Sequence, residues 1–293
     1  MVFRNSRCPN KPWDPNLIRS EIRRSLRYSL EWVYRRLTAR WRGLPQVYIA
    51  GVKRAGTSSL FRYLMEHPRA RYPFRQRKEI KFYIYMYDLG PSWYRAYFPF
   101  QRELQTHFTV DATPSYLMSP LFPERFMTLT PHAKIILLLR NPVQRTLSHY
   151  FHNRRRGLEP LSLEEALQAE EQRLAGEQER MLRDPCYVPW RYHRLGYLTE
   201  SRYVEHLRRL WKHVPREQTL VLRSEDFFEQ PQRLLDQIAD FLNIEPWQPN
   251  LKVYNQGQYD QPVPQRVRAQ LQAYFRPYNQ ALYELLGRDL GWN

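Results

Sequence analysis

The chain has 293 residues, enough to bury one substantial core, and its hydrophobic fraction of 42% with 15% aromatic residues excludes wholesale disorder. No apolar run approaches the length that spans a membrane. The net charge of +17 attracts any polyanion, but charge alone names no partner and predicts no specific nucleic acid.

Residues 1–44 form a basic arm that precedes the rest of the chain, residues 45–293. The arm has eleven Lys or Arg against three acidic residues, which accounts for +8 of the net charge. Apolar residues recur with a helical period over residues 17–41, which predicts an amphipathic basic helix. Such a helix fits either a peripheral contact with an anionic membrane or packing against the body of the protein, and we favour packing. Because no apolar leader follows the N-terminus, the expected location is cytoplasmic, peripheral to a membrane if the arm binds lipid.

Strands and helices alternate from residue 46 onward. The first predicted units are a strand at 47–51 with a helix at 58–66, and a short strand ending at Asp111. Next come a strand at 134–139 and a helix with Asn141 as its N-cap and Pro142 in its first position. The last unit is a strand at 219–223 with a helix at 224–242. Near-continuous apolar strands between helices predict a central parallel sheet covered on both faces. The expected class is therefore a three-layer α/β fold.

Two further helical regions complete this prediction. Residues 161–182 are acidic and helical, with Ser162 and Glu165 in the spacing of a capping box, and they interrupt the alternation as a helical insertion. The C-terminal stretch from residue 264 is predicted to form two short helices broken at Pro277.

The loop after the first strand resembles a phosphate-binding P-loop. Gly51 and Gly56 have the spacing of that motif, but Thr57 stands where a P-loop has its lysine, and Lys53 and Arg54 lie upstream. A loop that opens a helix directs backbone N–H groups and the helix dipole at an anion. Taken alone, a turn of small residues is common at such a position.

Two other strand ends carry polar groups. Arg140 directly follows the strand at 134–139, and Ser148 lies two turns into the next helix, so both can reach a phosphate. Glu79 stands between Lys78 and Lys81, which keep its carboxylate ionised and suited to act as a base in a partly desolvated pocket. Each feature alone is more often a solvated arginine or a surface ion-pair cluster.

Four ordered motifs together resemble a known family, the sulfotransferases that use 3′-phosphoadenosine 5′-phosphosulfate (PAPS), particularly those that sulfate heparan-type glycans and their bacterial relatives. The motifs are GVKRAGTSSLFRYLMEHP, KEIKFY with GPSWYRAYFP, DATPSYL, and IILLLRNPVQRTLSHY. The resemblance extends from residue 46 to nearly the end of the chain. It implies a P-loop-like fold and transfer of a sulfuryl group from PAPS to a hydroxyl or amine, with a carbohydrate as the expected acceptor.

The resemblance also implies roles for individual residues. Glu79 would deprotonate the acceptor, and Arg54 or Lys53 would stabilise the leaving phosphate. The expected cofactor-binding residues are Arg54, Ala55, Gly56, Thr57 and Ser58 around the 5′-phosphosulfate, Arg140 and Ser148 around the 3′-phosphate, and Gly257 and Tyr259 in a late loop. The expected acceptor-binding residues are Lys78, Lys81, Trp93, Tyr94, Thr113 and Tyr116.

Three alternatives stay open at this point. A P-loop nucleotide kinase or NTPase would use Asp111 for Mg²⁺, although the P-loop lysine is missing. A basic protein that binds nucleic acid or a membrane through residues 1–44, and a catalytically degenerate member of the family, are the others. Cys8, Cys186 and the scattered histidines show no metal-ligand spacing, so no metal is expected.

Overall fold

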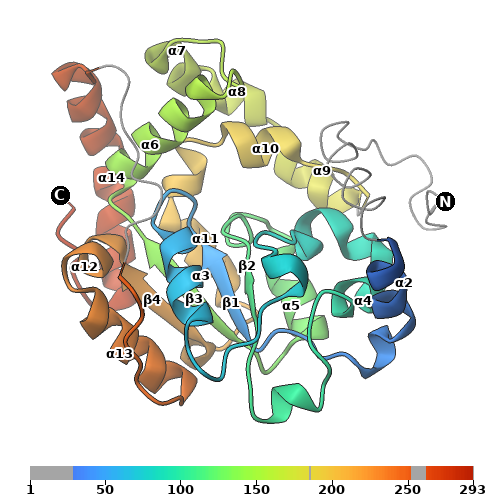
Figure 1. Ribbon diagram of the computed structural model, residues 1–293. Coiled ribbons are helices and arrows are strands. Elements are labelled where there is room, and N and C mark those ends of the chain that lie inside the picture. The colour runs from blue at the N-terminus through green and yellow to red at the C-terminus, as the bar shows by residue number, and fades with distance from the viewer. Residues whose placement is uncertain (1–28, 185, 252–261, 293) are drawn as a thin grey trace.

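A four-stranded parallel sheet lies at the centre of the computed structural model, which describes residues 29–184, 186–251 and 262–292. The strands are β1 (Val47–Gly51), β2 (Val110–Ala112), β3 (Lys134–Leu139) and β4 (Thr219–Arg223). Their order across the sheet is β2-β1-β3-β4, and each neighbouring pair is parallel (Figure 1). The predicted α/β fold with a central parallel sheet is confirmed.

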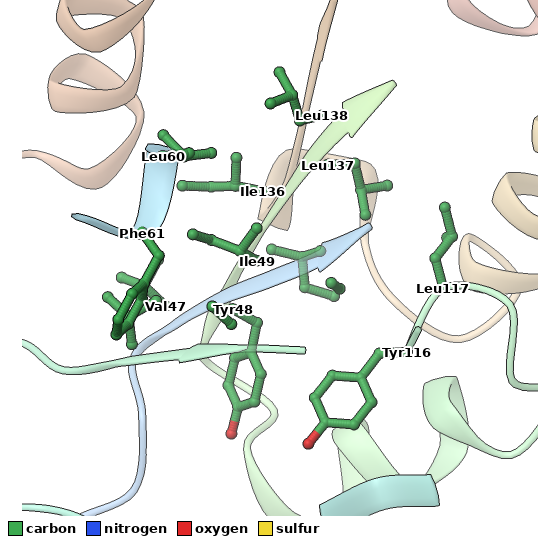
Figure 2. Close-up of a cluster of buried hydrophobic side chains, with 14 of the residues drawn as sticks. Val47, Tyr48, Ile49, Leu60, Phe61, Tyr116, Leu117, Ile136, Leu137 and Leu138 are labelled. Atoms are coloured by element: carbon green, nitrogen blue, oxygen red, sulfur yellow. The ribbon is translucent and has the colours of Figure 1, made fainter. Parts of the chain in front are cut away.

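Helices cover both faces of this sheet. The two that follow β1 and β2 are α3 (Thr57–Met65) and α5 (Phe122–Leu129). Side chains alternate along β1, so that Tyr48 meets the ring of Phe126 in α5 at a centroid distance of 5.1 Å. Its neighbour Ile49 points to the opposite face, where Leu60 of α3 is buried (Figure 2). Apolar residues fill both faces of the strand because each face has its own covering helix.

The connection between β3 and β4 is long and helical. Its helices are α6 (Pro142–Arg155), α7 (Leu163–Gln168), α8 (Glu170–Leu174), α9 (Glu177–Arg183), α10 (Trp190–Leu195) and α11 (Tyr203–Leu210). The side chain of Asn141 accepts hydrogen bonds from the backbone of Val143 and Gln144, which confirms the predicted cap of α6. The capping box of Ser162 and Glu165 is also present and opens α7 within the predicted insertion.

Two predicted helices end differently in the structure. The single helix predicted after β4 is two, α12 (Ser224–Glu229) and α13 (Pro231–Leu242), because a proline disfavours helical backbone at the residue before it and Gln230 has φ −135° and ψ 62°. The predicted break at Pro277 is wrong, since α14 (Gln265–Leu286) runs through it. Buried Phe275 and Leu282 on either side of Pro277 hold α14 in place.

The described end of the basic arm is a short helix. It consists of α2 (Ser29–Leu37) and a 3₁₀ turn (Ala39–Trp41), so the predicted helix does not run unbroken to residue 41, and its residues before 29 lie outside the described chain. Trp32 of α2 stacks on Phe74 at 5.8 Å and lies 4.8 Å from the ring of Tyr97, near the short helix α4 (Gly90–Arg95). In the described ranges, no helix is long and apolar enough to cross a membrane.

Candidate active site

A cleft opens beyond the carboxyl ends of the two central strands. The chain leaves β1 toward β2 on one side of the sheet and leaves β3 toward β4 on the other, so a crevice forms between β1 and β3, where ligands of open α/β sheets bind. A cavity of about 570 Å³ occupies this position. Its lining includes residues from the loop after β1, from the loop around Glu79, from α6 and from α10.

The loop after β1 leaves the start of α3 uncapped. Gly56 precedes the helix with φ 94°, and a Cβ at this position would lie 2.9 Å from the ring of Phe228, so a glycine is required. Among the described residues, no side chain caps the first N–H groups of α3, those of Thr57 and Ser58. Unsatisfied N–H groups at a helix start, together with its dipole, favour an anion.

Arg54 joins this loop to α6. Its Nε donates to the Ser148 hydroxyl at 3.1 Å, and its Nη1 lies 3.4 Å from Nδ1 of His152. Burial, and after it the charge of Arg54, lowers the pKa of His152 to about 4, so the ring is neutral at physiological pH and can accept this hydrogen bond. Arg140 donates to the Arg54 carbonyl oxygen at 2.8 Å. The structure therefore brings together three residues that the sequence predicted for anion binding.

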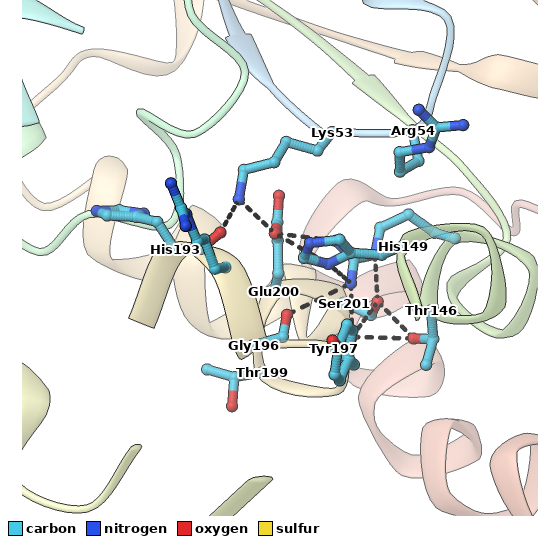
Figure 3. Close-up of polar contacts among 12 residues, drawn as sticks. Lys53, Arg54, Thr146, His149, His193, Gly196, Tyr197, Thr199, Glu200 and Ser201 are labelled. Atoms are coloured by element: carbon cyan, nitrogen blue, oxygen red, sulfur yellow. Dashed lines mark hydrogen bonds and ion pairs between the residues drawn. The ribbon is translucent and has the colours of Figure 1, made fainter. Parts of the chain in front are cut away.

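Lys53 turns away from Arg54 and into the protein. Its ammonium donates to the Glu200 carboxylate at 3.1 Å and to the carbonyl oxygen of His193 (Figure 3). Burial lowers the pKa of Lys53, and the nearby Glu200 carboxylate opposes that shift. Lys53 still lines the cleft, but its ammonium is paired with the buried carboxylate of Glu200.

Glu200 is the centre of a network that sequence reasoning missed. Arg145, with a fully buried side chain, places Nη1 3.0 Å from the same Glu200 oxygen and also donates to the Tyr197 carbonyl oxygen at 2.6 Å. His149 lies 3.8 Å from Glu200, and burial followed by the charges of Arg145 and Lys53 holds its pKa well below the usual range. No sequence pattern distinguishes Glu200 from a solvated glutamate, because the segment around it is polar.

Glu79 lines the same cleft. Its carboxylate is 3.5 Å from the Lys81 ammonium and 3.9 Å from that of Lys78, and its side chain is 42% exposed. Desolvation raises the pKa of Glu79, but the charges of Lys81, Lys78 and Lys53 outweigh it and leave the pKa below its ordinary value. The group is therefore an ionised carboxylate that can accept a proton.

The backbone around Glu79 is held in an uncommon conformation. Glu79 has φ 61° and Lys81 has φ 60°, the left-handed region that residues other than glycine rarely adopt. The Glu79 N–H donates to the Ala112 carbonyl oxygen at 3.0 Å, which fixes this loop to the end of β2. Arg54 in the facing loop has φ 70°, so both loops of the cleft contain strained residues, as functional sites often do.

Lys78 bridges the two loops. Its ammonium donates to the Ser58 hydroxyl at 2.8 Å and to the Thr57 hydroxyl at 3.4 Å, at the start of α3. Burial lowers the pKa of Lys78, and the Glu79 carboxylate opposes the shift. The sequence placed Lys78 among acceptor-binding residues, whereas the structure puts it between the uncapped helix start and Glu79.

Several residues expected to line the acceptor side are buried and do not line this cleft. Tyr94 and Tyr116 are fully buried and donate to Asp111 at 2.6 and 2.8 Å, and Thr113 donates to it at 2.7 Å. Trp93 packs against other aromatic rings and is not part of the lining. An apolar sheet face needs large side chains, and the buried Asp111 carboxylate needs hydroxyl donors, so these groups point inward.

The outer rim of the cleft comes from α10 and the end of α6. Trp190 is 44% exposed, and the guanidinium of Arg194 lies 5.7 Å from the centre of its ring. Arg156 lines the same region. Taken together, the described residues of the lining include six Lys or Arg side chains and one carboxylate, namely Lys53, Arg54, Lys78, Lys81, Arg156, Arg194 and Glu79. A cleft of this composition suits an anionic ligand.

Two residues expected to bind the cofactor lie outside the described chain. Gly257 and Tyr259 fall in residues 252–261, outside the described chain. Among the residues that the structure does describe, no group of three or more His, Cys, Asp or Glu side chains could hold a metal ion.

Comparison with known proteins gives consistent matches. Residues 44–258 match the family model described as "Sulfotransferase domain". The mouse protein "Heparan sulfate glucosamine 3-O-sulfotransferase 6" is 28% identical over 281 residues, which cover 86% of this chain and 75% of that protein. The Dictyostelium discoideum "Membrane-associated sulfotransferase kil1" is 27% identical, and the match covers 85% of this chain and 66% of that protein.

A solved structure shows a similar fold. The sulfotransferase from Alicyclobacillus acidocaldarius superposes with a TM-score of 0.63 at 27% identity. The match covers 85% of this chain and 98% of that one.

Proposed function

The chain belongs to the sulfotransferase family, and we propose that it transfers a sulfuryl group from PAPS to a hydroxyl or amine of a carbohydrate. The observation that carries this proposal is the position of Lys78. Its ammonium lies 2.8 Å from Ser58, at the uncapped start of α3, and 3.9 Å from the Glu79 carboxylate. A phosphosulfate bound at the helix start would thus have a cation beside its sulfuryl group and a base beyond it.

We assign the donor end of the cleft to the loop after β1 and to α6. The N–H groups at the start of α3, with Gly56 allowing close approach, would hold the 5′-phosphate. Arg140 and Ser148, which Arg54 links in the structure, would hold the 3′-phosphate that distinguishes PAPS from ATP. Arg54 is the cation of this loop that faces α6, since Lys53 is bound to Glu200.

The chemical step needs one proton acceptor and stabilisation of one developing charge. Glu79 takes the proton from the attacking hydroxyl or amine while a bond forms between that atom and sulfur. The bond between sulfur and the bridging phosphate oxygen breaks, and negative charge collects on that oxygen. Lys78 and the N–H groups of α3 stabilise this charge, and such preorganised donors contribute about 3 to 4 kcal/mol each. Both substrates held in one cleft gain the advantage of orientation.

The acceptor side favours an anionic carbohydrate. Lys81, Arg156 and Arg194 line the cleft, and the exposed ring of Trp190 offers a flat surface for a sugar. Relatives with 27–28% identity have names that include heparan sulfate glucosamine, which is a sulfated glycan unit. The nucleotide kinase alternative is less well supported, because Asp111 is buried and engaged by three hydroxyl groups.

Two measurements on the purified full chain test this proposal. Calorimetry should show that adenosine 3′,5′-bisphosphate binds more tightly than ATP, and a stronger response to ATP would contradict the donor assignment. A transfer assay with radiolabelled PAPS should then compare N-acetylheparosan, N-sulfated heparosan, chondroitin and neutral dextran as acceptors. Bisphosphate binding without transfer to any acceptor would indicate a catalytically degenerate protein.

A further inference from the structure

Helix α2 has apolar side chains on two faces. The inner face contributes Trp32, which packs against Phe74 and Tyr97, and Arg35, whose guanidinium lies 4.5 Å from the centre of the Phe74 ring. These contacts attach the helix to the body of the protein. The outer face is also apolar, and on a soluble helix this face would normally be polar.

Large apolar side chains continue along this outer face into the following 3₁₀ turn. Leu30 is 85% exposed and Leu37 is 74% exposed, and the other three members are about half exposed. We call these five residues the α2 stripe: Leu30, Val33, Tyr34, Leu37 and Trp41. The spacing of three, four and seven residues among Leu30, Val33, Tyr34 and Leu37 places these four along one side of α2, and Trp41 follows in the 3₁₀ turn. Of the ten large hydrophobic residues that are exposed in the described chain, five are in this stripe.

Positive charge accompanies the stripe. The segment from residue 29 to 42 contains four arginines and one glutamate, Glu31. Arg35 and Arg42 donate to backbone carbonyl oxygens of the body of the protein, whereas Arg40 is exposed. The Glu31 carboxylate is already neutralised by Arg75 at 2.8 Å and by Arg35 at 3.5 Å. The guanidinium of Arg40 lies 3.9 Å from the centre of the Trp41 ring, directly beside the apolar surface. An apolar stripe with aromatic residues and an exposed arginine beside it is complementary to anionic lipid.

We propose that the α2 stripe docks the protein on an anionic membrane surface. The leucines enter the acyl boundary, Trp41 and Tyr34 lie at the level of the headgroups, and the exposed Arg40 pairs with lipid phosphates. Helix α2 lies at the edge of the described part of the molecule (Figure 1). No residue of the stripe lines the cleft, so docking leaves the active site open. The inference does not depend on the proposed reaction.

Flotation of the full chain with lipid vesicles tests this proposal. The protein should rise with vesicles of phosphatidylcholine and phosphatidylglycerol, rise weakly with phosphatidylcholine alone, and bind less as salt is added. The double variant Leu30→Ser/Leu37→Ser should lose most of this binding, since each leucine moved out of water contributes about tenfold or more. Leu182→Ser, at a leucine that is 60% exposed on α9, is the matched control and should bind like the wild type.

Three results would overturn the proposal. The first is a wild-type chain that does not float with anionic vesicles. The second is a Leu30→Ser/Leu37→Ser variant that floats as well as the wild type, which would assign binding to another part of the chain. The third is a lipid-free dimer in sedimentation that this double variant abolishes, since the stripe would then be an interface between copies. Circular dichroism of each variant confirms that a loss of binding is not a loss of fold.

Discussion

The Lys53 ammonium and the Glu200 carboxylate are 3.1 Å apart and connect the loop after β1 to the segment before α11. Only 2% of the Glu200 side chain is exposed, and Arg145 approaches the same oxygen at 3.0 Å. One carboxylate thus compensates two cations in surroundings where an unpaired charge is costly. The pair explains why Lys53, although adjacent to Arg54, does not point along the loop toward α6.

Replacing Glu200 by glutamine should destabilise the protein strongly. The amide keeps the shape but leaves Lys53 and Arg145 buried without a counter-charge, and breaking a buried pair from one side costs about 3 to 5 kcal/mol. Urea unfolding monitored by fluorescence measures the difference. Glu171→Gln on the exposed side of α8 is the control and should change the free energy of unfolding by less than about 0.5 kcal/mol. Equal stability of the two variants would show that the ion network contributes nothing.

Replacing Arg140 by alanine should weaken the binding of adenosine 3′,5′-bisphosphate. A charge-assisted hydrogen bond contributes about 1.5 to 3 kcal/mol, which corresponds to a loss of roughly ten- to hundredfold in affinity. Ser148→Ala should have a smaller effect, because a neutral hydroxyl contributes only about 1 kcal/mol. Calorimetry with Arg208→Ala, at an exposed arginine on α11, provides the reference. Unchanged affinity in Arg140→Ala would remove the 3′-phosphate assignment.

Local rules explain what the sequence predicted well. Asn141 and Pro142 predicted the start of α6 because an amide cap and a proline in the first turn act on neighbouring backbone groups. The strands could also be predicted from the sequence, since the strands of a parallel sheet buried on both faces consist of nearly continuous apolar runs. The meeting of Arg54, Arg140 and Ser148 could also be anticipated, because the carboxyl ends of parallel strands share one edge of the sheet.

Features that depend on tertiary packing could not be predicted from the sequence. Tyr94 and Tyr116 were expected in the cleft, but only the fold shows that they point to the buried carboxylate of Asp111. The sequence did not distinguish Pro231, which separates two helices, from Pro277, which lies within one. Burial of Glu200 depends on the positions of α6 and of the segment before α11, which no local pattern specifies.

Replacing Lys78 by methionine should lower kcat more than it raises KM for the donor. Methionine keeps an unbranched chain of similar length but removes the charge that we place beside the leaving oxygen. Loss of one preorganised donor lowers kcat by about a hundred- to a thousandfold. Lys81→Met, whose side chain is not in contact with α3 hydroxyl groups in the structure, should instead act mainly on KM for the acceptor. Similar kcat values for both variants would place Lys78 on the acceptor side, as the sequence first suggested.

The dependence of kcat/KM on pH should report the ionisation of Glu79 in the free enzyme. Its pKa lies below the ordinary value of 4.5, because the charges of Lys81, Lys78 and Lys53 outweigh desolvation. A base must be ionised, so the rate should stay level as the pH falls from neutral and decline only below about 4.5. The lowered pKa of Glu79 also stabilises the folded protein at any pH above the pKa of this group in the unfolded chain. This stability is lost as the pH falls through the pKa of Glu79 in the folded protein. Circular dichroism must therefore be measured at each pH, to separate a loss of rate from a loss of fold.

Two variants distinguish Glu79 from other groups that titrate in this range. Lys78→Met removes one of the cations that lower the pKa of Glu79, so the acid limb of the residual activity should move to higher pH. Glu79→Gln cannot accept a proton, and it should retain bisphosphate binding while losing transfer by about a hundredfold or more. An acid limb that stays in place in Lys78→Met, or near-normal turnover of Glu79→Gln with labelled PAPS, would mean that another group accepts the proton.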